Sequence, residues 1–162
     1  MSKWNVAFPL NYQIRLASKL DLREICSIED DSFSTPYPRY LMAKLLEYNP
    51  STFLVVVDES GRLLAYCVAS INGKSAHLIS VAVVGNARRK GAATLLLRGL
   101  FGRLVGFGVG EVWLEVNAHD MGAVTLYLKL GFEKLMTVDN YYSDGSAAIK
   151  MRLSLSSGVV HE

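Results

Sequence analysis

A basic segment, Arg88-Arg89-Lys90, lies between a predicted strand that ends near Val84 and a predicted helix that begins at Ala92. The first N–H groups of a helix have no acceptor within the helix, and the helix dipole favours negative charge there. Small residues such as Gly91 let an anion approach the main chain, and the cations supply countercharge. The segment therefore predicts a phosphate-binding turn. The alternative is an ordinary solvated helix start with three exposed cations.

Other phosphate and metal motifs do not fit this chain. The turn lacks the Lys-Ser/Thr pair of a Walker-type loop and the three spaced glycines of a dinucleotide fingerprint. Cys26 and Cys67 lack the paired spacing of a zinc site, and two thiols are too few for a disulfide scaffold. Both lie among apolar neighbours, so we expect them to fill core space. No trio of His, Cys and carboxylate side chains has metal-ligand spacing, and we expect no metal.

The composition indicates one folded domain. The chain has 162 residues, of which 51% are hydrophobic and 20% charged, and single cores run to about 100–200 residues. We expect residues 1–155 to form the domain and residues 156–162 a flexible tail. The 17 basic and 15 acidic residues give a net charge of +2, too small to imply a nucleic-acid partner. No apolar stretch is long enough for a secretory signal or a membrane span, so we expect a soluble cytoplasmic protein.

The basic turn belongs to an alternation of predicted strands and helices. The segments 53–57 and 63–71 are apolar and β-branched and flank turn residues, which predicts a hairpin. Leu97, Leu100 and Leu104 recur at helical spacing, which predicts an amphipathic helix packed on a sheet. The predicted strands are 12–16, 53–57, 63–71, 75–84, 111–116, 132–138 and 147–155, and the predicted helices begin at residues 21, 39, 92 and 121. This order predicts a mixed α/β sheet covered by helices.

Several motifs together resemble one known family. Arg88, Gly91 and Ala93 match the signature Arg/Gln-x-x-Gly-x-Gly/Ala with which acetyltransferases of the GNAT superfamily hold the pyrophosphate of acetyl-coenzyme A. The downstream segments that strengthen the match are Leu114-Glu115-Val116, Leu126-Tyr127, Lys129-Leu130-Gly131-Phe132, Tyr141-Tyr142-Ser143-Asp144-Gly145 and Ala148-Ile149-Lys150-Met151. From Ile14 to Leu153 the chain is similar to protein N-terminal acetyltransferases, in particular the RimI-like enzymes that acetylate ribosomal proteins and their archaeal relatives.

The resemblance implies a fold and a cofactor site. The GNAT fold is a mixed, mostly antiparallel sheet whose two central strands splay apart to admit the pantetheine, flanked by about four helices. Acetyl-CoA would be the donor and CoA the product. The main chain of Val81, Ala82 and Val83 would pair with the pantetheine, and the N–H of Val83 could polarise the thioester carbonyl. The residues expected around the pyrophosphate are Arg88, Arg89, Lys90, Gly91, Ala92, Ala93 and Thr94.

One predicted cofactor contact departs from the family pattern. Asp120 stands where the family usually has Asn, whose amide contacts the cofactor. An ionised Asp accepts hydrogen bonds but cannot donate them, and its charge would face an anionic ligand. We therefore expect this replacement to weaken the affinity for acetyl-CoA.

The resemblance also assigns catalytic roles, with Glu115 as the base and Tyr127 as the acid. Glu115 lies between Leu114 and Val116, so strand alternation turns it to the opposite face, where partial desolvation would raise its pKa. The alternatives are an exposed strand carboxylate for Glu115 and a core or helix-surface phenol for Tyr127. His77 could share the role of base through a water, or be a strand histidine hydrogen-bonded to a neighbour.

The acceptor would bind beside these groups. Phe33 and Tyr37 lie in the loop between the first two helices, and Tyr141 and Tyr142 lie near the last hairpin. The resemblance implies that these residues border the substrate amino terminus. The alternative for the hairpin tyrosines is surface aromatic packing. We therefore expect an enzyme that acetylates the α-amino group of a protein or peptide by direct attack, with ribosomal proteins among the candidate acceptors.

Two other functions stay open at the level of sequence. One is acetyl transfer to a small amine or a lysine side chain, because this scaffold serves many acceptors. The other is a non-catalytic module that binds acyl-CoA. In each case we expect no nucleic acid or membrane partner, and a monomer or small homo-oligomer. The sequence does not indicate which N-terminal residues are preferred or whether an auxiliary subunit is needed.

Overall fold

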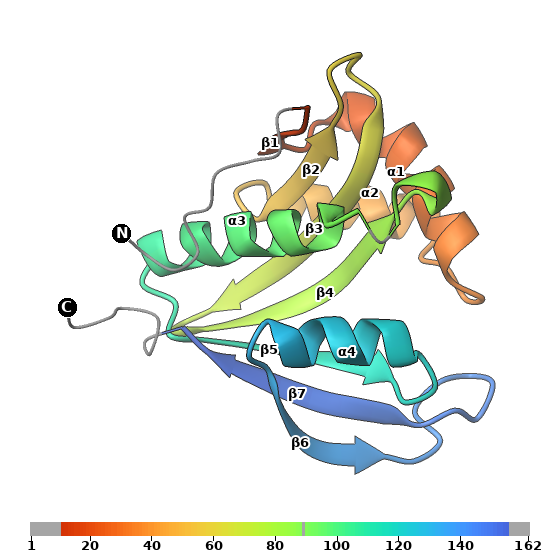
Figure 1. The fold of residues 1–162 in the computed structure, drawn as a ribbon, viewed down its shortest axis with the longest axis vertical. Helices are drawn as coiled ribbons and strands as arrows, with labels where there is room; N and C mark the ends of the chain where they lie inside the picture. Colours follow the sequence, from red (N-terminus) through yellow and green to blue (C-terminus); the bar gives the residue numbers. More distant parts are fainter. Residues whose placement is uncertain (1–10, 89, 156–162) are drawn as a thin grey trace.

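The computed structural model describes residues 11–88 and 90–155, which form one seven-stranded sheet with helices on both faces (Figure 1). The strands are β1 (Gln13–Leu16), β2 (Phe53–Val57), β3 (Leu63–Asn72), β4 (Ser75–Val83), β5 (Glu111–Asn117), β6 (Glu133–Val138) and β7 (Ala148–Ser154). The helices are α1 (Leu22–Ser32), α2 (Arg39–Tyr48), α3 (Ala92–Gly106) and α4 (Met121–Lys129). The predicted order of elements and the mixed α/β class are confirmed. The predicted tail, residues 156–162, and Arg89 lie outside the described residues.

Two short 3₁₀ helices, η1 (Lys19–Asp21) and η2 (Gly85–Ala87), were not predicted. Each has three residues, fewer than one repeat of an amphipathic pattern, so hydrophobic periodicity cannot indicate them.

The sheet has the strand order β1-β2-β3-β4-β5-β7-β6, and all its pairs are antiparallel except β4 with β5. Helices α3 and α4 cover one face with a core that includes Leu97, Leu100 and Leu114. Helices α1 and α2 cover the β2–β4 part of the other face, with a core that includes Ile25 and Met42. The helical spacing of the leucines in α3 thus predicted the buried side of that helix.

The β4–β5 pair is short. Only three residue pairs join these strands, from Ser75 with Glu111 to His77 with Trp113. A register shift follows in the β3–β4 ladder, where Val68 pairs with Ser80 but Ala69 pairs with Leu78, so Ile79 is an extra residue in β4. Such a bulge bends its strand and reverses which face the following side chains occupy. Beyond it, β4 and β5 diverge, as Figure 1 shows, and the predicted splayed central pair is confirmed.

The two cysteines differ. Cys67 is fully buried in β3, as predicted, and burial raises the pKa of its thiol. Cys26 in α1 is only half-buried. In the part of the chain that the structure describes, no helix is long and apolar enough to cross a membrane.

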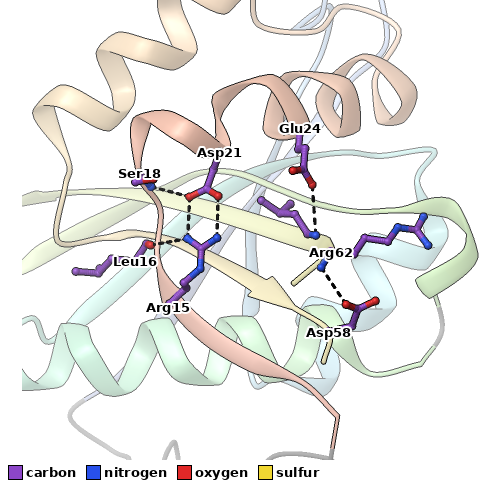
Figure 2. A network of polar contacts seen from close by, with 8 residues as sticks. Arg15, Leu16, Ser18, Asp21, Glu24, Asp58 and Arg62 are labelled. Carbon is purple, nitrogen blue, oxygen red and sulfur yellow. Dashed lines mark hydrogen bonds and ion pairs between the residues drawn. The ribbon is translucent and has the colours of Figure 1, made fainter. Parts of the chain in front are cut away.

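An ion pair fastens β1 to the start of α1. Both terminal nitrogens of Arg15 donate to the carboxylate of Asp21 at 2.8 Å, and the Ser18 N–H donates to the same carboxylate at 2.7 Å (Figure 2). Asp21 is buried, and the Arg15 hydrogen bond, with the help of Ser18, holds the pKa of its carboxyl group below the usual value. A group with a lowered pKa stabilises the fold above its unfolded-state pKa, and that contribution disappears as the pH falls through the folded-state pKa.

We therefore expect Arg15→Ala to lower the free energy of unfolding by about 1 kcal/mol at pH 7, a value reduced for the partial exposure of the arginine. The difference from the wild type should shrink as the pH falls below about 4. Denaturant titrations of both proteins at pH 7 and pH 3 measure this. An equal difference at both pH values would contradict the assignment of the stabilisation to this ion pair.

Candidate active site

Two titratable side chains are in direct contact where the pairing of β4 with β5 ends. The Nε2 atom of His77 lies 2.8 Å from Oε2 of Glu115, two residues beyond Trp113 on the same face of β5. Leu114 and Val116 are buried on the other face, as strand alternation predicts. The side chains of His77 and Glu115 are 30% and 17% exposed, so solvent or a ligand can reach both. The arrangement can accept and share a proton.

Trp113 and Lys150 were not identified from the sequence as part of this site. The indole of Trp113 stacks on the His77 ring, with centroids 4.0 Å apart and planes 8° apart. The Nζ atom of Lys150, from β7, lies 4.8 Å from the indole centroid. Since β5 lies between β4 and β7, the indole separates the imidazole from the ammonium group. The sequence feature that could have indicated Trp113 is its two-residue spacing from Glu115, which puts both side chains on one face of a strand.

Three tyrosines lie close enough to Glu115 for its charge to affect them. Burial raises the pKa of Tyr37, Tyr141 and Tyr142, the last to about 12, and the negative charge of Glu115 raises each of them further. The rings of Tyr141 and Tyr142 meet edge to face with centroids 4.9 Å apart. The structure thus brings Glu115 together with three tyrosines that the sequence analysis placed at the acceptor site, Tyr37, Tyr141 and Tyr142.

The two loops that carry these tyrosines also meet each other. The Thr35 hydroxyl, between α1 and α2, lies 3.4 Å from the Ser143 hydroxyl, between β6 and β7. Phe33 begins the first of these loops and is 40% exposed. Loops that are distant in sequence therefore form one rim beside Glu115.

Tyr127 lies on the other face of β5. It is 6% exposed in the core that α4 forms with Leu114 and Val116, and its ring meets Phe132 edge to face at 5.5 Å. Burial, followed by the negative charge of Asp120, raises the pKa of its phenol. Because Glu115 points away from this core, Glu115 and Tyr127 lie on opposite faces of the sheet.

The main chain of β4 borders this region. Val84 N–H donates to Leu64 at 2.8 Å, and ladder directions alternate along an antiparallel pair. The backbone groups of Ala82 are therefore turned toward β3, while those of Val81 and Val83 are turned toward the gap. Arg88 Nε already donates to the Val83 carbonyl at 3.0 Å. Of the three predicted pantetheine residues, only Val81 and Val83 can present main-chain groups to a ligand there.

The basic turn has the features of an anion site. Gly91, with φ +83°, occupies the N-cap of α3 and brings no side chain to cap the helix. The first helical hydrogen bond runs from Leu95 N–H to the Gly91 carbonyl. The N–H groups of residues 92–94 precede it and lack helical acceptors. Arg88 and Lys90 are exposed beside them, so the residues present fit a diphosphate.

The predicted residues of the turn differ in accessibility. Ala92 is buried against the core, whereas Ala93 and Thr94 are half-buried. Arg88 reaches back to α1, where its Nη2 donates to the Ser32 hydroxyl at 3.2 Å. The turn is thus tied to the helix that precedes the Tyr37 loop.

Asp120 has a structural role that the sequence analysis did not assign. Its Oδ1 atom accepts from the Ala123 N–H at 3.0 Å, which makes Asp120 the N-cap of α4. Asp immediately before a predicted helix is a capping signal, so the role was readable from the sequence. The charge of this carboxylate also adds to the effect of burial in raising the pKa of Tyr127.

Comparison with known proteins identifies what this arrangement is similar to. The sequence model of the acetyltransferase (GNAT) family matches residues 22–132. An N-alpha-acetyltransferase of Sulfurisphaera tokodaii is 31% identical over 158 residues, covering 89% of this chain and 93% of the relative. The [ribosomal protein bS18]-alanine N-acetyltransferase of Escherichia coli is 35% identical over 103 residues, covering 62% and 70%. The solved structure of Ard1 from Thermoplasma volcanium superposes with a TM-score of 0.85 at 27% identity, covering 88% and 97%.

Two substitutions at Asp120 separate its capping role from its charge. Asp120→Ala should lower the free energy of unfolding by about 1 kcal/mol, whereas Asp120→Asn, an equally good N-cap, should change it little. Denaturant titration measures both.

We also expect Asp120→Asn to bind acetyl-CoA more tightly in calorimetry, because the substitution removes a negative charge that would face an anionic ligand. Equal destabilisation by Asp120→Ala and Asp120→Asn would contradict the capping role. An unchanged affinity of Asp120→Asn for acetyl-CoA would contradict the expected effect of the charge.

Proposed function

Because this chain belongs to the acetyltransferase (GNAT) family, and is therefore an acetyl-CoA-dependent N-acetyltransferase, we propose that it acetylates the N-terminal α-amino group of a protein. The observation that carries the proposal is the direct contact of His77 with Glu115 beneath a rim of tyrosines. Two relatives support it: the Sulfurisphaera protein is named as an N-alpha-acetyltransferase, and the E. coli protein as a [ribosomal protein bS18]-alanine N-acetyltransferase.

Acetyl-CoA, when bound, supplies an activated acyl thioester. Val81 and Val83 would hold its pantetheine by main-chain hydrogen bonds in the gap, in the manner of an added strand. The N–H groups of residues 92–94, with Arg88 and Lys90, would hold its diphosphate. Two features support this placement of the cofactor: the main-chain groups of Val81 and Val83 are turned away from β3, and the first N–H groups of α3 have no helical acceptors.

The acceptor amine must lose a proton before it can attack. An α-amino group with a pKa of 7.7–8.0 is about 9–17% neutral at pH 7, whereas a lysine amine with a pKa near 10.4 is only about 0.04% neutral. Glu115 would accept the proton that leaves the ammonium group, and His77 Nε2, in contact with Oε2, would share it. The carboxylate also attracts the cationic terminus before deprotonation.

Tyr127 would act on the other side of the gap. A raised pKa keeps its phenol protonated at neutral pH, which is the state that can donate to the departing sulfur. A thiol releases its proton near pH 8.5, below the usual phenol value of about 10. Tyr127 therefore holds its proton more tightly than a thiol does, and we expect it to stabilise the thiolate by hydrogen bonding as the bond breaks.

The rim above Glu115 supports a peptide acceptor over a small amine. Tyr37, Tyr141 and Tyr142 combine ring faces with hydroxyl groups, which suit the backbone and side chain of a first residue. The E. coli relative is named for N-acetylation of an alanine of ribosomal protein bS18, and we include ribosomal proteins among the acceptors. The second candidate function is transfer to a small amine or lysine side chain, which the same proton acceptor would serve.

Mass spectrometry of acceptors incubated with acetyl-CoA tests the proposal. Peptides that differ in residue one should gain an acetyl group on the α-nitrogen. Matched peptides with a blocked α-amine and a free internal lysine, together with spermidine, should react at least about 100-fold more slowly at pH 7, because less of their amine is neutral. Activity on the small amine or lysine alone would replace the proposal, and tight acetyl-CoA binding without transfer to any acceptor would favour a binding module.

Substitution of the proposed base, Glu115, and of the proposed hydrogen-bond donor to the thiolate, Tyr127, tests the mechanism. Glu115→Gln and Tyr127→Phe should each lower kcat by about 100-fold while the affinity for acetyl-CoA stays within about twofold, since both groups act on the chemical step. Glu111→Gln is the matched control, because Glu111 lies on the same face of β5 but contacts Ser75 and Arg152. Wild-type turnover across the pH range in either variant would remove that residue's role.

A further inference from the structure

Glu29, in the last turn of α1, is a buried carboxylate that the proposed chemistry does not use. The residue is 2% exposed. Three donors converge on it: the hydroxyls of Tyr66 and Ser80 on Oε2, the latter at 3.2 Å, and the Tyr37 N–H on Oε1 at 3.1 Å. Every donor is a neutral group. Among the described residues, no lysine or arginine forms an ion pair with it.

A buried carboxylate without a cation is costly, because the hydrogen bonds must replace its whole hydration. An apolar side chain of similar size would avoid this cost in the same core, where Ile25 and Met42 already pack. The contribution of Glu29 to global stability is therefore a weak explanation for the carboxylate. What the charge does provide is strong hydrogen bonding from neutral donors at fixed positions.

The two carboxylate oxygens connect different parts of the molecule. Oε2 is bound to Tyr66 in β3 and Ser80 in β4, just after the bulge at Ile79. Oε1 is bound to the main chain of Tyr37, in the loop between α1 and α2. His77 lies on the same strand as Ser80, three residues earlier. Glu29 thus fixes the position of the loop relative to the strand that carries His77.

The tethered residue belongs to the loop that forms one side of the rim, where Thr35 meets Ser143. Burial raises the pKa of Tyr37, and the negative charges of Glu29 and Glu115 raise it further. We propose that Glu29 is a positioning residue that holds the α1–α2 loop over the acceptor site through the Tyr37 N–H, and so sets the affinity for the acceptor peptide rather than that for acetyl-CoA. This inference rests on the proposed function for its kinetic part only.

The test substitutes Glu29→Met, which fills a similar volume and removes the acceptor for the Tyr37 N–H. The Tyr66 and Ser80 hydroxyls, already 3.1 Å apart, can then bond to each other. Asp21→Ala is the matched control, because Asp21 is a buried carboxylate at the other end of α1, bonded to Arg15. Glu29→Gln retains one carbonyl oxygen for the Tyr37 N–H and is the conservative rescue.

We expect Glu29→Met to raise the KM for an acceptor peptide at least about 10-fold, the loss of one hydrogen bond to a charged group, with the KM for acetyl-CoA within twofold. Glu29→Gln should restore the peptide KM to within about threefold of the wild type. Asp21→Ala should lower stability without changing the peptide KM. Equal changes in both KM values for Glu29→Met, or the same peptide KM change in Asp21→Ala, would overturn the positioning role.

Amide hydrogen exchange tests the tether without any assumption about the substrate. In the wild type, the Tyr37 amide should exchange at least about 100-fold more slowly than in an unstructured peptide, and Glu29→Met should remove this protection while α2 stays protected. An unprotected Tyr37 amide in the wild type overturns the inference even if Glu29→Met fails to fold. If no peptide is acetylated but the protection depends on Glu29, the proposed function fails while the tether stands.

Discussion

The candidate site depends on one constraint, the early end of the parallel pairing between β4 and β5. The extra residue Ile79 bends β4 away after three residue pairs, so two central strands are left with unpaired inner edges in an otherwise continuous sheet. An unpaired edge inside a domain would normally be costly, since buried backbone groups need partners. A ligand that completes the hydrogen bonds of Val81 and Val83 removes this cost. The same gap is the one route by which Glu115 and Tyr127, on opposite faces of β5, can act on one reaction.

The two sides of the gap carry charges that suit the two proposed reactants. Arg88, Lys90 and the start of α3 form a positive side, which suits the diphosphate of the donor. Glu115 and Glu29 provide negative charge on the side of the tyrosine rim, which suits a protonated amine. The net charge of +2 conceals this separation, because the opposite charges nearly cancel over the whole chain. Charge position, rather than net charge, therefore distinguishes the donor side from the acceptor side.

The sequence was sufficient to predict the helices and strands and the face of the sheet that each strand side chain occupies, because these follow from local hydrophobic patterns. The placement of Glu115 opposite Leu114 and Val116 is an example. The bulge at Ile79 has no local signature, and the contact of His77 with Glu115 depends on the register of strands 38 residues apart in sequence. Trp113 and the buried Glu29 became visible only through such long-range packing. The basic turn was recognisable in advance because a helix start and its cations are neighbours in sequence.

The short β4–β5 ladder also has a mechanical consequence. Residues Ser75–His77 and Glu111–Trp113 form the vertex of a wedge, with β1–β4 as one arm and β5, β7 and β6 as the other. A rotation of one arm by a few degrees about this vertex displaces its tip far more than its base. The His77–Glu115 contact lies near the vertex, where displacement is least, while the Thr35–Ser143 contact joins loops far along the two arms. The spacing of the two titratable groups is therefore far less sensitive to the opening angle of the wedge than the spacing of the two loops is.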